Sequence, residues 1–196
     1  NERGQADALV ARQLAGENIA LVSDAGTPCI SDPGWALVSA AVRSGIEVIG
    51  VCGPSAVITA LSVSGFEFCS FAFYGFFPRE QGELARFVEQ LARSDISVSV
   101  VFESPMRIKK TLRLLADALP GAELCLCNDL TKLHERIYRG SPADVLDRLE
   151  ANPAADKGEY TLVIRVTHSE DENNSEPDAL SPEALLVDSL IKNGGT

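Results

Sequence analysis

The densest group of polar and turn-forming residues is the segment SDAGTPCISDPG, residues 23–34. It follows four apolar residues, IALV at 19–22, and precedes a stretch with helical periodicity. Glycine lets the backbone approach a ligand closely, and proline holds a loop in one shape. Asp24 and Asp32 can accept hydrogen bonds from ribose hydroxyls or an amino group, or favour a cationic ligand. The alternative is an ordinary strand-to-helix turn, in which Asp32 caps the helix that follows.

A second loop, CGPSA at 52–56, follows the apolar run IEVIGV at 46–51 in the same way. Ligands of open α/β sheets bind outside the carboxyl ends of the strands, so both loops are candidates for a site. Ser55 and the free N–H groups of the next helix start can hold a polar ligand. Neither loop has the spacing G-x-G-x-x-G or a phosphate-loop lysine, which argues against nicotinamide and nucleoside-triphosphate sites.

A third group, TKLHE at 131–135, places Lys132, His134 and Glu135 together. Histidine has a pKa suited to proton transfer near neutral pH, so this group can serve a reacting hydroxyl. The alternative is a solvated loop or strand end, in which Lys132 and Glu135 are ordinary surface charges.

Two arginines follow proline-containing turns, Arg79 in FFPR and Arg107 in SPMR. Arginine at such positions can contact phosphate, or it can pair with the glutamate beside each turn. Phe76 and Phe77 can stack on a splayed base. Phenylalanine in an apolar run is also typical of a core, and we expect both rings in the core.

Hydrophobic periodicity predicts the elements that position these loops. We expect helices at 2–15, 35–43, 54–65, 80–94, 104–120 and 141–152, the last two each beginning at a Ser-Pro pair that starts with a capping serine. We expect strands at 19–22, 46–51, within 66–77, and at 96–102, 122–127 and 159–166. The alternation indicates α/β architecture, with a parallel sheet and crossover helices in the first third. The expected units are 1–66, 67–168, and an acidic linker with a short helix at 169–196.

Composition limits the class of protein. The chain has 196 residues, a net charge of −11 and 45% apolar residues, enough for one large or two small globular domains. No apolar run approaches the ~20 residues of a membrane helix. The acidic balance is not that of a non-specific nucleic-acid binder. The five cysteines include no C-x-x-C pair, which fits a reducing cytoplasm without a disulfide framework or a metal site.

Six segments in order resemble one family across residues 1–166: LVSDAGTPCISDPG, GPSAVITALSVSG, GFFPRE, FESPMR, DLTKLHERIYRG and KGEYTLVI. They are similar to the tetrapyrrole methylase superfamily of S-adenosylmethionine (SAM) enzymes, and within it to the bacterial methyltransferases of small-subunit ribosomal RNA. The resemblance implies two α/β domains with SAM in the cleft between them. It also implies 2′-O-methylation of a cytidine of 16S rRNA in the 30S subunit, and a homodimer.

The resemblance assigns roles to the three groups of residues. It implies that SAM is bound by Asp24, Ala25, Gly26, Thr27, Ser31, Asp32, Pro33, Gly34, Pro54, Ser55 and Ala56. We expect Lys132 and His134 to serve the reaction, chiefly by positioning the substrate. The expected substrate-binding residues are Arg79, Ser104, Arg107 and Glu135.

The sequence departs from the family pattern in places. The family's first strand and an E-D-T-R segment have no counterpart, so we expect an incomplete N-terminal domain. Met106 stands where the family usually has histidine, and Asp129 where it has glutamate. We expect the chain to fold, because 67–168 carries its own core, but to bind SAM more weakly than a complete protein. Apolar surface at 19–22 or 46–51 should stay exposed or be covered by another copy.

Two other functions stay open. One is an enzyme of the same superfamily that methylates a tetrapyrrole or a modified amino acid, against which the SDAGTP and TKLHE segments argue. The other is a non-catalytic domain or fragment, against which the intact SDAGTP and GPSA loops argue.

Overall fold

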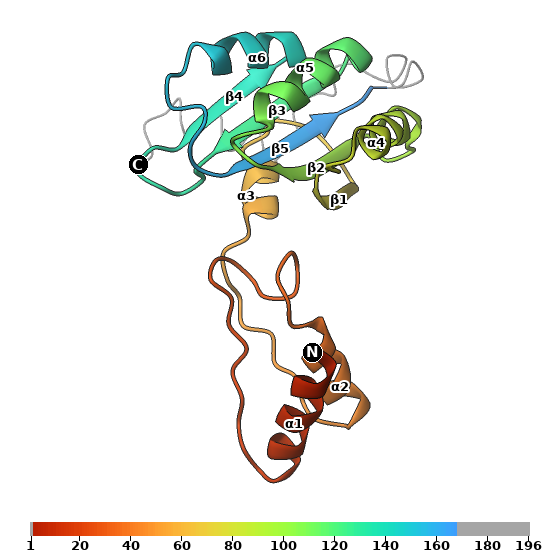
Figure 1. Cartoon of the computed structure of the whole chain (residues 1–196), viewed down its shortest axis with the longest axis vertical. Coiled ribbons are helices and arrows are strands. Elements are labelled where there is room, and N and C mark those ends of the chain that lie inside the picture. Colours follow the sequence, from red (N-terminus) through yellow and green to blue (C-terminus); the bar gives the residue numbers. More distant parts are fainter. Residues whose placement is uncertain (1, 168–196) are drawn as a thin grey trace, which may run out of the picture.

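A five-stranded mixed sheet organises the C-terminal part of the chain in the computed structural model, which describes residues 2–167 (Figure 1). The strand order is β1-β2-β5-β3-β4, with the parallel pair β1–β2 and three antiparallel pairs. The carboxyl ends of β1, β2 and β3 therefore share one edge of the sheet, called here the carboxyl edge. The strands are β1 (Phe71–Phe76), β2 (Val98–Glu103), β3 (Glu123–Asn128), β4 (Arg136–Gly140) and β5 (Tyr160–Arg165).

Helices cover both faces of this sheet (Figure 1). One face packs against α4 (Gln81–Arg93), α5 (Ile108–Ala118) and α6 (Pro142–Glu150), and the other against α3 (Ala56–Ser62). Along β3, Leu124 and Leu126 face the larger helical layer, while Cys125 and Cys127 face α3. This period-two alternation explains why β3 is buried along almost its whole length.

The two Ser-Pro helix starts turn out differently. Ser141 caps α6 as expected, since its hydroxyl accepts the Asp144 N–H at 3.2 Å in a complete capping box. The expected cap at Ser104 is wrong, because α5 begins only at Ile108. Residues 104–107 form a preceding turn, in which the Glu103 carboxylate accepts the Ser104 N–H at 2.6 Å.

The N-terminal part contains α1 (Glu2–Leu14) and α2 (Trp35–Arg43), which pack through small side chains such as Ala6 and Ala40. Both helices are where the periodicity predicts them. The strands expected at 19–22 and 46–51 are wrong, and so is a parallel sheet in this third of the described chain. A strand requires a hydrogen-bonded neighbour, and neither segment has one within residues 2–167.

The exposure expected for these segments is confirmed. Val22 is 80% exposed, Ile49 75% and Val51 84%. The division of the chain at residue 66 stays a prediction, and α3, which precedes it, packs on the sheet through Val57 and Leu61. The linker and helix expected at 169–196 lie outside the described residues. No helix within 2–167 is long and apolar enough to cross a membrane.

Two sequence interpretations around the sheet are corrected. Phe77 lies in the core as expected, but Phe76 is exposed at the end of the edge strand β1, where it packs edge-on against Phe102. The sequence did not predict strand β4, because its residues RIYRG are few and two of the five are exposed.

Candidate functional site

The two loops expected to bind the cofactor contact each other. The Thr27 hydroxyl donates to the Pro54 carbonyl oxygen at 3.2 Å. A β-carbon at Gly26 would lie 3.3 Å from the same oxygen, so this glycine allows the loops to approach closely. Loop 23–34 and loop 52–56, which are far apart in sequence, therefore form one continuous surface.

A cavity of about 340 Å³ lies between α1 and both ends of loop 23–34, within the size range of small-ligand sites. Of the expected cofactor residues, four line it: Asp24, Asp32, Pro33 and Gly34. The expected residues at 25–27, Ser31 and 54–56 lie outside its lining. The sequence interpretation missed Gln5 and Leu9, which line the cavity from α1. Their helical spacing of four was a usable signal, because it places them on one face of α1.

Gly34 fixes the shape of the cavity wall. Its φ of +133° lies in the region that favours glycine, and a β-carbon there would lie 2.7 Å from Leu21 Cδ2. Gly34 is also the N-cap of α2, which has no side-chain cap. The alternative that Asp32 caps this helix is therefore wrong, whereas Ser55 does cap α3 by accepting the Ile58 N–H at 3.4 Å.

The carboxyl edge collects the other group of expected residues. Arg79 follows β1, Ser104 and Arg107 follow β2, and the segment 131–135 follows β3. Because these three strands run in the same direction, their loops emerge at the same edge. Residues drawn from three distant motifs therefore share one end of the sheet.

Lys132 is held by two carboxylates at this edge. Its ammonium donates to Glu159 Oε2 at 2.7 Å and to Asp129 Oδ1 at 3.4 Å. The hydrogen bond to Glu159, with a smaller contribution from Asp129, raises the pKa of Lys132 above its ordinary value. Lys132 is therefore held as a cation by these two carboxylates and is unsuited to accepting a proton.

The backbone around Lys132 is unusual. Asp129 and Thr131 both have positive φ, at 50° and 63°, a conformation that costs free energy in residues other than glycine. The Glu135 carboxylate accepts the Thr131 N–H at 2.6 Å and stabilises this turn. His134 is exposed beside it, and no hydrogen bond of its ring occurs within residues 2–167.

Arg107 pairs with the neighbouring glutamate, which was one of the two interpretations of its sequence position. Its guanidinium contacts Glu103 Oε1 at 2.7 Å and donates to the carbonyl oxygens of Phe77 and Pro78, each at 3.2 Å. The Ser104 hydroxyl accepts from Arg107 Nε at 3.4 Å. This network joins the loop after β1 to the loop after β2, and it leaves Arg79 exposed at the surface.

Solved structures of methyltransferases share this architecture. Diphthine synthase superposes with a TM-score of 0.59 at 16% identity, covering 84% of this chain and 66% of that one. Uroporphyrin-III C-methyltransferase from Thermus thermophilus, complexed with S-adenosylhomocysteine, gives a TM-score of 0.51 at 14% identity over 84% and 74%. At these identities the likeness defines the fold, and it confirms the expected α/β class.

The chain belongs to the Tetrapyrrole (Corrin/Porphyrin) Methylases, whose family pattern matches residues 1–146. Relatives named ribosomal RNA small subunit methyltransferase I are similar to it. The one from Hydrogenobaculum sp. (strain Y04AAS1) is 43% identical over 76% of this chain and 63% of its own. The one from Vibrio cholerae (serotype O1) is 38% identical over 97% and 66%. The resemblance seen in the motifs is confirmed, and this chain spans slightly less than two thirds of those two relatives.

Proposed function

We propose that this chain forms part of a SAM-dependent methyltransferase that methylates the ribose 2′-hydroxyl of a cytidine in 16S rRNA. The observation that carries the proposal is the 38% identity, along 97% of the chain, to a relative named for small-subunit rRNA methylation. A cavity lined by both ends of loop 23–34 and a separate edge bearing cations support it.

The cavity lined by α1 and by both ends of loop 23–34 fits the cofactor. Two carboxylates, those of Asp24 and Asp32, line it, and carboxylates favour a sulfonium and an amino group. We propose that an adenine extends beyond this cavity to the place where Gly26 approaches Pro54, so that backbone groups of both loops read its edge. When bound, SAM supplies an electrophilic methyl group. The residues that would hold it are those expected from the sequence: 24–27, 31–34 and 54–56.

The carboxyl edge is the proposed face for the RNA. Lys132 stays protonated and holds a backbone phosphate or a ribose oxygen, which aligns the hydroxyl with the methyl group. His134, exposed beside Lys132, would accept the proton of that hydroxyl. Arg79 contacts phosphate from the surface, while Arg107, Ser104 and Glu135 hold the loops in position.

We propose a homodimer as well, acting in the cytoplasm where ribosomal subunits are found. The exposed apolar side chains of 19–22 and 46–51 support an additional contact, because apolar surface of this kind gains free energy when it is covered. Sedimentation of the protein over a range of concentrations tests this, and a strictly monomeric species would contradict it.

Transfer of label from tritiated SAM to 30S subunits lacking the modification tests the main proposal. We expect label in 16S rRNA, and ribose-methyl mapping should locate it on a cytidine. Arg93→Ala, which removes an exposed cation from the last turn of α4 at the opposite edge of the sheet, is the control for Lys132→Ala. Intact SAM binding without label in 16S rRNA would overturn the RNA assignment. Label in a small molecule instead would favour another reaction of the superfamily.

A further inference from the structure

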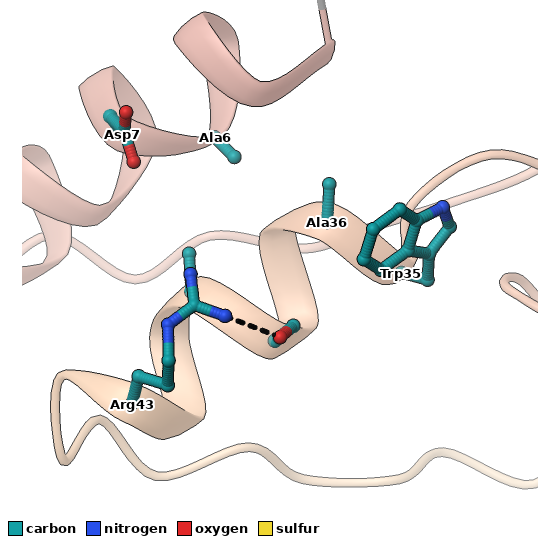
Figure 2. Close-up of a pocket in the computed structure, with 7 residues that line it drawn as sticks. Ala6, Asp7, Trp35, Ala36 and Arg43 are labelled. Atoms are coloured by element: carbon teal, nitrogen blue, oxygen red, sulfur yellow. Dashed lines mark hydrogen bonds between the residues drawn. The ribbon is translucent and has the colours of Figure 1, made fainter.

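A second hollow, of about 350 Å³, lies between α1 and α2, and none of the expected site residues lines it (Figure 2). Its lining is Ala6, Asp7, Trp35, Ala36, Ser39, Ala40 and Arg43, and we call it the α1–α2 groove. Figure 2 shows the indole of Trp35 at one end of the groove, with the guanidinium of Arg43 toward the other.

The shape of the groove follows from the sequence of α2. Trp35, Ser39 and Arg43 are spaced by four residues, so they project from one face of the helix. The floor between the helices is made by Ala6, Ala40 and other small buried residues, which leave space that larger side chains would fill. Trp35 is 57% exposed, so one part of its ring contacts the protein while the rest meets solvent.

Two charged side chains of the groove, Arg43 and Asp7, have hydrogen-bonding capacity to offer a ligand. Arg43 donates to the Ser39 hydroxyl at 2.7 Å, which turns the guanidinium back along the helix over the groove. A guanidinium has five N–H donors, and this is the one hydrogen bond of the Arg43 side chain within residues 2–167. Asp7 lines the same space from α1, and within those residues it forms no ion pair with Arg43.

We propose that the α1–α2 groove binds a nucleotide, with the base stacked on Trp35 and the phosphate held by Arg43. Aromatic faces stack on bases, and guanidinium groups bind phosphate through paired N–H donors. The eight residue steps from Trp35 to Arg43 span about 12 Å of helix, which gives room for a base, a ribose and a phosphate in line. Asp7 accepts a hydrogen bond from a ribose hydroxyl or an exocyclic amine.

The source of this nucleotide is inferred from the proposed function, which makes RNA the substrate. An rRNA methyltransferase must contact its substrate at more nucleotides than the one that reacts, because phosphate contacts set the register and orientation of the RNA. The groove would then hold an unpaired nucleotide of the RNA away from the carboxyl edge. A free nucleotide offers the same chemistry, and the experiment separates the two sources.

Fluorescence of Trp35 is the direct readout, because it is the only tryptophan in the chain. We would titrate the protein with cytidine monophosphate, cytidine, inorganic phosphate and a single-stranded oligoribonucleotide. Stacking predicts saturable quenching by cytidine monophosphate, about 10-fold weaker binding of cytidine, and no quenching by phosphate. Arg43→Ala should reduce the affinity for the monophosphate to that for cytidine. Arg93→Ala, which removes an arginine from the last turn of α4, is the control and should change nothing.

The outcomes separate the alternatives. Absence of quenching by every nucleotide, or quenching unaffected by Arg43→Ala, overturns the groove assignment. Tighter binding of the oligoribonucleotide than of the monophosphate supports RNA as the source, and the reverse order overturns it in favour of a free nucleotide. Quenching that persists in a protein unable to label 16S rRNA would refute the proposed function while leaving the groove assignment intact.

Discussion

The buried carboxylate of Glu103 provides a sharp test of the energetics at the carboxyl edge. Its side chain is 1% exposed and has three partners: the Ser104 N–H at 2.6 Å, the Thr111 hydroxyl at 2.7 Å and Arg107 at 2.7 Å. Glu103→Gln keeps the shape of the side chain and removes its charge. The change leaves the Arg107 guanidinium without its counter-charge beside the core.

The expected cost follows from the exposure of the two partners. Breaking a fully buried ion pair costs about 3–5 kcal/mol. Because the Arg107 side chain is 29% exposed, water compensates part of that loss, and the glutamine amide retains part of the hydrogen bonding. We therefore expect a loss of about 2–3 kcal/mol in the free energy of unfolding. A change of this size should lower Tm by about 5–10 °C in a protein of this length.

A second pair in the same chain is a matched control. Glu89 and Arg93 have the same spacing of four residues and the same 2.7 Å separation, but their side chains are 58% and 77% exposed. Glu89→Gln should therefore cost about 0.5 kcal/mol or less. Urea unfolding followed by circular dichroism compares the two variants. Equal costs would refute the reasoning that burial, rather than geometry, gives the Glu103 pair its strength.

The remaining predictions concern three other places. Gly34→Ala should destabilise the α1–α2 region by more than ~1 kcal/mol, because a φ of +133° is strained for any residue that carries a β-carbon; unchanged amide hydrogen exchange in both helices would contradict this. Lys132→Ala should slow methyl transfer about 10²-fold with nearly unchanged SAM affinity, whereas Asp24→Ala should weaken SAM binding; equal losses of affinity in calorimetry would show that the two loops are wrongly divided. Burial raises the pKa of Tyr160 to about 12, so folding disfavours its ionised form, and about 2–3 kcal/mol of stability should be lost as pH rises from about 10 to 12. Tyr160→Phe should abolish that dependence in urea titrations, and an undiminished loss would assign it to another group.

Strong hydrophobic periodicity made most of the helices predictable from the sequence. The apolar positions Ile108, Leu112 and Leu115 of α5 are buried together as their spacing predicts. The start of that helix was mispredicted, because the side chain of Glu103, which lies outside the Ser-Pro pattern, takes the N–H of Ser104. At this position the buried Glu103 carboxylate outweighs the capping preference of the Ser-Pro pair, and helix propensities do not describe such a contact.

Strand prediction failed where the presence or absence of a neighbouring strand determines whether a segment forms a strand. Residues 19–22 and 46–51 have the composition of buried strands, but no described segment pairs with them. Strand β4 shows the reverse: RIYRG has few strand signals, and pairing with β3 makes it a strand. An edge strand has one face and one side in solvent, which weakens the pattern that periodicity detects.

The candidate site was partly accessible to the sequence. The turn residues of loops 23–34 and 52–56 indicated a ligand surface, and the structure brings the loops into contact through Thr27 and Pro54. The gathering of Arg79 and Lys132 at one edge depends on strand direction, which the sequence did not determine. The α1–α2 groove escaped notice because alanines at helical spacing look like ordinary core.

The central position of β5 has a consequence for synthesis of the protein. It is the last strand within residues 2–167, yet it lies between β2 and β3 and pairs with both along its full length. On the ribosome, β1–β2 and β3–β4 can each form early, but they cannot join until residue 165 has left the exit tunnel. The two half-sheets present open edges during that interval, when holding chaperones would bind them most readily. Pauses in translation before residue 165 emerges from the tunnel should therefore increase aggregation far more than pauses after it has emerged.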